Sequence, residues 1–165
     1  MLVYLVRHGI AAEKTDPSSP SDRMRPLTPR GVAKTNEVAR GLAKLTERPS
    51  VMMTSPLLRA VETAEIFCEV LNFPVTRLRQ TDSLLPESKP ALLFGELAKL
   101  RAHAVICFGH APHLDAVIAA ATGRGAAFTR LKKAGVALLE FESVDPPRAL
   151  LGFLYTPKIL RKVAR

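Results

Sequence analysis

Short, mostly apolar runs alternate with segments of helical periodicity along this chain, and this order is what most restricts its fold. The runs lie at residues 2–6, 51–53, 75–78, 104–108, 136–141 and 150–155. The helical segments lie at residues 29–45, 55–71, 89–101 and 112–121. Short runs bounded by turn residues are typical of strands, and apolar residues spaced three or four apart are typical of helices. Strands that alternate with helices predict an α/β fold, with a mostly parallel central sheet flanked by helices on both faces.

The chain is long enough for one domain of ordinary size. Its 165 residues contain no internal repeat and no extended linker. The polar, turn-rich stretch at residues 15–25 is predicted to be a surface loop. We therefore expect a single domain over residues 1–156, followed by a basic C-terminal tail over residues 157–165.

Several classes of protein are excluded by composition. The longest apolar runs are too short to span a bilayer. The N-terminus has neither the basic start nor the long apolar core of a secretory signal, so a cytoplasmic protein is expected. Cys68 and Cys107 lack the spacing of metal ligands and are expected to be buried free thiols.

The charge is the unusual part of the composition. Lys and Arg number 24 against 15 Asp and Glu, which gives a formal net charge of +9. Such a field favours anionic partners, whether a nucleic acid, a membrane or a phosphate group. The chain has no Trp, only 5% aromatic residues and no nucleic-acid recognition motif, which weighs against a surface built on base stacking. We expect neither a nucleic acid nor a membrane as partner.

Charged residues and histidines follow three of the predicted strands. Arg7 and His8 follow residues 2–6, Arg59 lies one turn into the helix after the second strand, and His110 follows residues 104–108. In open α/β sheets, ligands bind beyond the carboxyl ends of the strands. The sequence therefore predicts that two arginines and two histidines meet at one edge of the sheet.

This set of residue types suits phosphoryl transfer. Guanidinium groups bind phosphate oxygens in pairs and stay charged at physiological pH. A neutral imidazole can attack phosphorus and hold the phosphoryl group, while a second imidazole, if protonated, can stabilise the transferring charge. The sequence offers no carboxylate cluster for magnesium and no Walker-type glycine loop, so no metal and no other cofactor are expected.

Four sequence motifs resemble those of one enzyme family. They are LVYLVRHG at residues 2–9, LTPRG at 27–31, TSPLLRA at 54–60 and GH at 109–110. By these motifs, which occur in the family's order, the chain resembles the histidine phosphatase superfamily over nearly its whole length. Its small size and the runs RPLT at 25–28 and GHAP at 109–112 are most similar to phosphohistidine phosphatases of the SixA type.

The resemblance implies an architecture and a set of residue roles. The architecture is the phosphoglycerate mutase-like, three-layer α/β/α sandwich. His8 corresponds to the nucleophile that is transiently phosphorylated, and Arg7 and Arg59 correspond to the two arginines that hold the phosphate. His110 corresponds to the histidine that stabilises the transferring phosphoryl group, and Arg25 to an additional arginine of the pocket.

The general acid is the incomplete part of the pattern. Larger members of the superfamily use a Glu in a loop after the third strand or an Asp directly after the second histidine, and here Ala111 follows His110. Glu87 lies in a loop that could match the first option, although a Glu beside a proline is commonly just exposed. Glu87 is thus a candidate acid and substrate contact. Gly9, within the signature, is a further expected substrate contact.

Plainer interpretations stand beside these roles. Arg7 and His8 could be a solvated strand edge, and Arg59 could pair with Glu62 three residues on. Arg25 follows a loop of uncertain path and could be solvated. In addition, His113 is expected to be a surface residue, although it could also contact substrate.

The missing acid bears on the substrate. An alkoxide leaves phosphorus poorly unless it is protonated, whereas imidazole, with a pKa of about 6.5, leaves far more readily. We therefore expect a phosphatase with a phosphohistidine intermediate that acts on phosphohistidine of a partner protein, such as a phosphotransfer domain. The alternatives are a phosphatase of a small phosphorylated metabolite, or a non-catalytic phosphate-binding protein; mutase activity is not expected.

Overall fold

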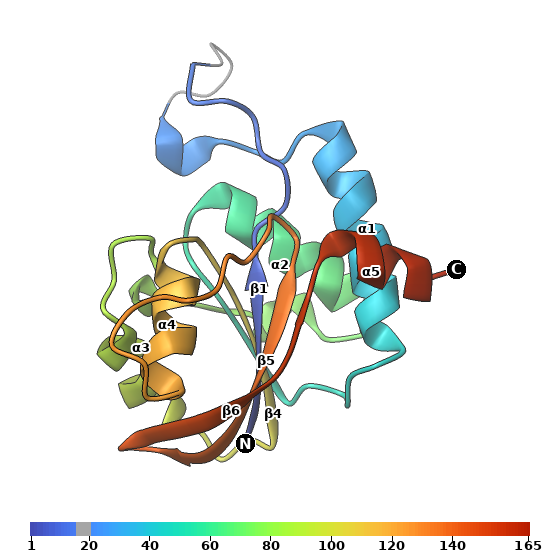
Figure 1. Ribbon diagram of the computed structural model, residues 1–165. Helices are drawn as coiled ribbons and strands as arrows, with labels where there is room; N and C mark the ends of the chain where they lie inside the picture. The colour runs from blue at the N-terminus through green and yellow to red at the C-terminus, as the bar shows by residue number, and fades with distance from the viewer. Residues whose placement is uncertain (16–20) are drawn as a thin grey trace.

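A six-stranded sheet runs through the molecule in the order β3-β2-β4-β1-β5-β6 (Figure 1). The structure is a computed structural model that describes residues 1–15 and 21–165. The strands are β1 (Leu2–Arg7), β2 (Val51–Thr54), β3 (Arg79–Gln80), β4 (Ala104–Gly109), β5 (Val136–Val144) and β6 (Pro147–Tyr155). β1, β2, β3 and β4 pair in parallel, whereas β5 pairs antiparallel with both of its neighbours, β1 and β6. The predicted mostly parallel sheet is therefore confirmed.

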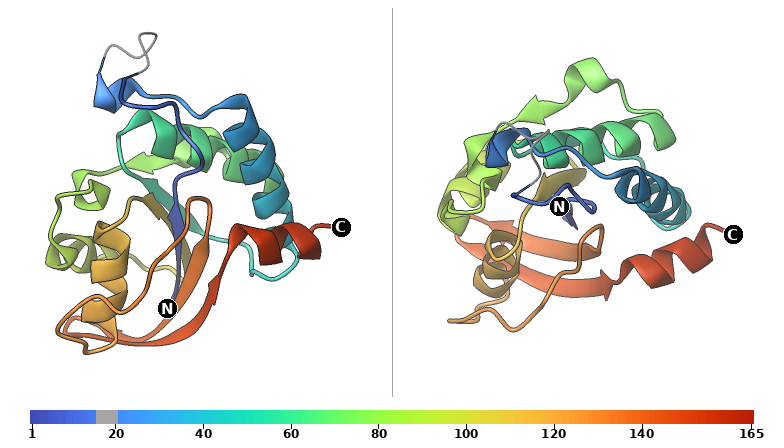
Figure 2. Two further views of the ribbon diagram at one scale, coloured as in Figure 1. Left: turned by 45° about the horizontal axis from the view of Figure 1, so that its top comes forward. Right: turned by 90° about the horizontal axis from the view of Figure 1, so that it is seen from above.

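Helices cover both faces of this sheet, as Figure 2 shows from above. On one face lie α1 (Pro29–Ala43), α2 (Leu58–Val70) and α5 (Pro157–Val163), and on the other lie α3 (Pro90–Leu97) and α4 (His113–Ala121). Successive residues of β1 serve the two cores, since Val3 packs with α3 and α4 while Tyr4 packs with α1 and α2. All six residues of β4 are buried, as expected for a central strand covered on both sides. The predicted three-layer α/β/α sandwich is confirmed.

The register of the parallel strands aligns their carboxyl ends. Arg7, the last residue of β1, lies beside Gly109 of β4. Thr54, the last residue of β2, lies beside Phe108 of the same strand. The segments that follow β1, β2 and β4 therefore begin at one edge of the sheet, where the sequence predicted the functional residues.

The start of α1 follows from its capping residues. The Thr28 side chain accepts a hydrogen bond from the Gly31 backbone N–H at 3.0 Å, and Pro29 occupies the first helical position. This arrangement satisfies one of the backbone donors that a helix leaves free at its N-terminus. The predicted cap is confirmed.

Two predicted elements differ from the structure. Residues 75–78 were expected to form a strand, but Val75–Arg77 form a 3-10 helix, η2, and only Arg79–Gln80 join the sheet. The backbone N–H of Leu78 bonds to the Val75 carbonyl, so this short segment satisfies its polar groups within a turn. The helix expected over residues 89–101 ends as α3 at Leu97, and tight turns follow it.

The segment expected to be a basic tail is instead packed onto the domain. Residues Pro157–Val163 form α5 against α1, with Leu160 fully buried. Arg161 Nε donates to Glu37 Oε2 of α1 at 2.7 Å. The two helix backbones can approach closely because Gly41 has no side chain; a Cβ there would collide with the Leu160 carbonyl. Because Lys and Arg are abundant in this segment, the sequence did not indicate that Leu160 would be buried against the domain.

The two cysteines agree with the sequence-based expectation. Cys68 and Cys107 are free and buried, and burial raises the pKa of their thiols to about 11 and about 12. In the described part of the chain, no helix is long and apolar enough to cross a membrane.

The contact between α1 and α5 can be tested with two glycine substitutions. Gly41→Ala should lower the free energy of unfolding by about 1–3 kcal/mol, because the added methyl group forces the backbones apart. Gly95→Ala in α3, where a Cβ meets nothing within 4 Å, should raise it by about 0.5–1 kcal/mol. Urea unfolding of both variants measures the difference, and equal effects would contradict the close packing of α5.

Candidate active site

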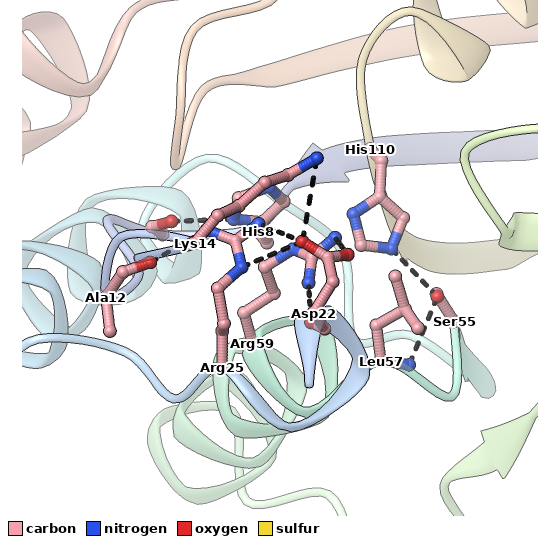
Figure 3. A network of polar contacts seen from close by, with 10 residues as sticks. His8, Ala12, Lys14, Asp22, Arg25, Ser55, Leu57, Arg59 and His110 are labelled. Carbon is pink, nitrogen blue, oxygen red and sulfur yellow. Dashed lines mark hydrogen bonds and ion pairs between the residues drawn. The ribbon is translucent and has the colours of Figure 1, made fainter. Parts of the chain in front are cut away.

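The structure brings the predicted arginines and histidines together at the carboxyl edge of the sheet. His8 directly follows β1, His110 directly follows β4, and Arg59 is the second residue of α2. The His8 and His110 rings lie with their centroids 5.1 Å apart and are inclined by 50° (Figure 3). His8, Arg59 and His110 are 7%, 4% and 2% exposed. The interpretation as a solvated strand edge does not fit the burial of His8, whereas Arg7 is half-buried.

A hydrogen bond fixes which nitrogen of His8 is free. Its Nδ1 lies 2.7 Å from the Gly9 carbonyl oxygen, which can only accept. Nδ1 therefore carries the proton and donates it, and Nε2 of the neutral ring keeps its lone pair. The Gly9 N–H in turn donates to Thr63 Oγ1, whose hydroxyl donates to the Arg59 carbonyl. The nucleophile candidate is thus tied to the helix that carries Arg59.

Both site histidines are neutral near pH 7 without a bound anion. Burial lowers the pKa of His8 to about 3, and the charges of Arg59 and Arg7 add to this despite the opposing Gly9 hydrogen bond. Burial also lowers the pKa of His110 to about 3, with smaller contributions from His8 and Arg59. His110 Nε2 lies 2.8 Å from Ser55 Oγ, and its Nδ1 has no partner among the described residues. A dianion beside His110 would favour its protonated form.

The two predicted clamp arginines are held by backbone carbonyls. Arg7 Nη1 donates to the Leu131 carbonyl at 2.8 Å, and Arg59 Nη1 donates to the Asp22 carbonyl at 2.8 Å. The buried Nε atoms of Arg7 and Arg59 have no hydrogen-bond partner in residues 1–15 and 21–165. Burial lowers the pKa of both guanidiniums, which remain charged at physiological pH. Both side chains retain donors for a bound oxyanion.

Asp22 is a site residue that the sequence analysis missed. Its carboxylate accepts from Arg59 Nη2 at 3.3 Å and from Arg25 Nε at 2.9 Å, and Lys14 Nζ lies 3.9 Å away (Figure 3). Partial burial raises the pKa of Asp22, but the nearby arginines outweigh this and lower it. The Asp22 carboxylate thus accepts from guanidinium N–H groups that could otherwise donate to a phosphate. The only signal for it in the sequence was its position three residues before Arg25.

Arg25 is held on the wall of the site. Its Nη1 donates to the Ala12 carbonyl at 2.7 Å, and its side chain is largely covered by the loop and by Asp22. The alternative pairing of Arg59 with Glu62 does not form. Instead, Glu62 Oε2 accepts from the Leu27 backbone N–H at 2.6 Å and so fixes the segment that follows Arg25.

The acid candidate and its neighbour differ in exposure. Glu87 is exposed, and no hydrogen bond joins it to His8 or His110 in the part of the chain described. His113, expected at the surface, is instead 2% exposed, because it lies on the inner side of the first turn of α4. Burial lowers the pKa of His113, and the charge of Glu87 opposes this. Among the described residues, no group of three His, Cys, Asp or Glu side chains is arranged to hold a metal ion.

Comparison with known proteins identifies the family of this chain. The family model of the histidine phosphatase superfamily (branch 1) matches residues 3–84, the range that contains Arg7, His8 and Arg59. An uncharacterized protein of Picosynechococcus sp. is 35% identical over 140 residues, covering 82% of this chain and 82% of that protein.

Two solved structures share the fold over nearly the whole chain. The protein histidine phosphatase SixA complexed with tungstate has a TM-score of 0.86 at 24% identity, covering 97% of this chain and 99% of that one. A SixA from Agrobacterium tumefaciens has a TM-score of 0.77 at 22% identity, covering 94% and 97%. These likenesses agree with the expected phosphoglycerate mutase-like fold. A histidine nucleophile is general to the matched family. The family match therefore supports phosphatase activity. The protein belongs to the histidine phosphatase superfamily.

Proposed function

We propose that this protein is a phosphohistidine phosphatase in which His8 is the nucleophile and the substrate is phosphohistidine on a partner protein. The observation that carries the proposal is the state of His8: a neutral ring whose Nδ1 donates to the Gly9 carbonyl. This leaves the Nε2 lone pair available for attack on phosphorus. Arg7, Arg59 and His110 lie around the same strand ends and supply donors for the phosphoryl oxygens.

The reaction takes place in two displacements. His8 Nε2 attacks phosphorus of a phosphohistidine whose other ring nitrogen is protonated, a new N–P bond forms, and the N–P bond of the substrate breaks. The electron pair of that bond stays on the substrate ring, which leaves as neutral imidazole, while the phosphorylated His8 ring keeps its Nδ1 proton and becomes cationic. Water then attacks the phosphoenzyme, the His8 N–P bond breaks, and inorganic phosphate is released. Arg7 and Arg59 hold the oxygens, and His110 gains positive character as the dianion binds beside it. Arg59 exchanges its contact with Asp22 for the phosphate.

The leaving group favours phosphohistidine over an alkyl phosphate. Imidazole departs without a strong acid, and Glu87 is exposed rather than held against the two histidines. The likeness to SixA, described as a protein histidine phosphatase, supports the same substrate class. The tungstate in that structure is a tetrahedral oxyanion like phosphate, in agreement with a phosphoryl pocket in this fold.

A second candidate function is hydrolysis of a small phosphorylated metabolite. It is favoured by one observation, the proximity of Glu87 to His113, which sets a carboxyl group near the His110 side of the site. Protonated Glu87 would then donate to the departing alkoxide. A non-catalytic phosphate-binding protein is the third possibility, and absence of turnover with every substrate class would favour it.

The nucleophile is tested by a matched pair of histidine variants. His8→Ala should reduce phosphate release from a phosphohistidine protein at least about a thousandfold, because no other group can form the covalent intermediate. His103→Ala is the control, since His103 is exposed and its one ion pair within residues 1–15 and 21–165 is with Glu47. It should keep full activity. Retained turnover in His8→Ala would contradict the mechanism.

The substrate class is tested by comparing leaving groups. Wild-type protein should turn over phosphohistidine with a kcat/KM at least about 10²-fold above that for sugar phosphates and phosphoserine, because these need acid catalysis. Glu87→Gln should change phosphohistidine turnover by less than about threefold. Comparable turnover of a sugar phosphate, with a large loss in Glu87→Gln, would instead establish the metabolite phosphatase.

The neutral state of His8 predicts how stability depends on pH. The His8 pKa is about 3 in the folded protein against 6.5 in the unfolded chain, so the unfolded chain binds more protons between these values. The free energy of unfolding should therefore fall as pH drops below 6.5, by up to about 1.4 kcal/mol per pH unit for this histidine. His8→Asn should show a shallower fall in urea unfolding between pH 6.5 and 4.5, whereas His103→Asn should match the wild type. Identical slopes for His8→Asn and wild type would exclude a buried neutral His8.

A further inference from the structure

A basic cleft lies beside the site, between α1, the loop before β5, and α5. Its volume is about 390 Å³. Six of its lining residues carry the argument: Lys34 and Thr35 of α1, Lys132 and Lys133 of the loop, and Lys158 and Arg161 of α5. Among the residues that the structure describes, none of those lining the cleft is acidic. We refer to the hollow lined by these residues as the basic cleft.

The charge of the basic cleft is largely uncompensated. Arg161 is paired with Glu37, but the four lysines have no carboxylate within 4 Å in residues 1–15 and 21–165. Cations gathered around a hollow repel one another and create a local field that attracts anions. The cleft therefore has the charge that an acidic ligand requires.

A buried hydroxyl in the wall of the cleft also lacks a partner. Thr35 is fully buried, yet its Oγ1 has no hydrogen bond to any described residue. Buried polar atoms are nearly always hydrogen-bonded in folded proteins, so this hydroxyl is an exception, although with no exposed surface it does not reach a ligand in the cleft. The hydroxyl lies against Gly9, where a Cβ would collide with it, and so close to the nucleophile segment.

The loop of the basic cleft is joined directly to the active site. The backbone N–H of Ala134 donates to the carbonyls of Arg7 and His8, at 2.9 and 3.1 Å. The Leu131 carbonyl holds the Arg7 guanidinium. Ile10, which also lines the cleft, follows Gly9 in the chain. A ligand in the cleft would thus lie next to a group bound at His8.

We propose that the basic cleft docks an acidic segment of the phosphorylated partner protein, so that its phosphohistidine is directed to His8. This inference rests on the proposed function. A carboxylate-bearing segment fits better than a nucleic acid, because the cleft has four unpaired lysines but no aromatic side chain on which a base could stack. Docking on lysines outside the reaction centre also lets the enzyme select a protein rather than any phosphoramidate.

The test uses two charge-matched double variants of the full chain. Lys34→Glu/Lys158→Glu reverses two charges of the cleft, and the side-chain hydrogen bonds of Arg7 and His8 in the described residues involve neither lysine. Lys99→Glu/Arg101→Glu makes the same change at exposed positions just before β4, at the opposite end of that strand from His110. The pair separates a local docking effect from the general effect of net charge.

Two measurements are made on each protein. The first is the KM for dephosphorylation of an acidic phosphohistidine-carrying protein, and the second is the affinity for hexaglutamate by NMR titration of the 15N-labelled chain. Hexaglutamate should shift the amide signals of the cleft residues. The cleft variant should raise the KM and the hexaglutamate Kd by about tenfold, and the control variant by less than about twofold.

The outcomes distinguish this proposal from the proposed function. Equal effects of the two variants, or hexaglutamate shifts outside the cleft, would overturn the docking surface even if phosphohistidine is turned over. Binding of hexaglutamate in the cleft, without turnover of the phosphoprotein by wild-type protein, would support the acidic docking site and refute the substrate. Tighter binding of a DNA oligonucleotide in the cleft than of hexaglutamate, at 0.15 M salt, would overturn the protein partner.

Discussion

The in-register parallel pairing of β4 with both β1 and β2 is the constraint on which the rest of this structure depends. It sets Arg7 beside Gly109 and Thr54 beside Phe108, so three chain segments leave the sheet at one level. Because β4 is buried along its whole length, a shift of its register would expose core residues and separate the two histidines. The packing that stabilises the sheet thus also fixes the geometry of the site.

Burial and charge are balanced within that site. The low exposure that makes His8 and His110 part of the core also removes water from their rings, and this keeps both neutral and leaves the His8 lone pair available. Buried positive charge is unfavourable unless it is compensated. Here the Asp22 carboxylate and backbone carbonyls compensate Arg59 and Arg7 until an oxyanion binds. Asp22 therefore lies against guanidinium donors that, under the proposed function, would bind the phosphoryl dianion.

Local patterns in the sequence were enough to predict the fold and the core of the candidate site. The alternation of strands and helices predicted the layers, and the strand-end rule predicted that Arg7, His8, Arg59 and His110 would meet. Four of the features that were missed depend on contacts between segments distant in the chain. They are the pairing of Asp22 with Arg59, the bond from Leu27 to Glu62, the burial of His113, and the packing of Leu160 on Gly41. None of these contacts produces a local pattern, such as helical periodicity or a capping residue, from which it could be predicted.

The proposed function requires that a phosphoryl group pass through His8 Nε2. The most direct measurement is base quenching of wild-type protein during turnover of a phosphohistidine protein, followed by location of the phosphoryl group by 31P NMR and peptide mass spectrometry. We expect a phosphoenzyme in which the phosphoryl group is attached to His8 Nε2, because His8 Nδ1 is held by the Gly9 carbonyl. Phosphate found on His110, or turnover with no phosphorylated enzyme at any time point, would contradict it.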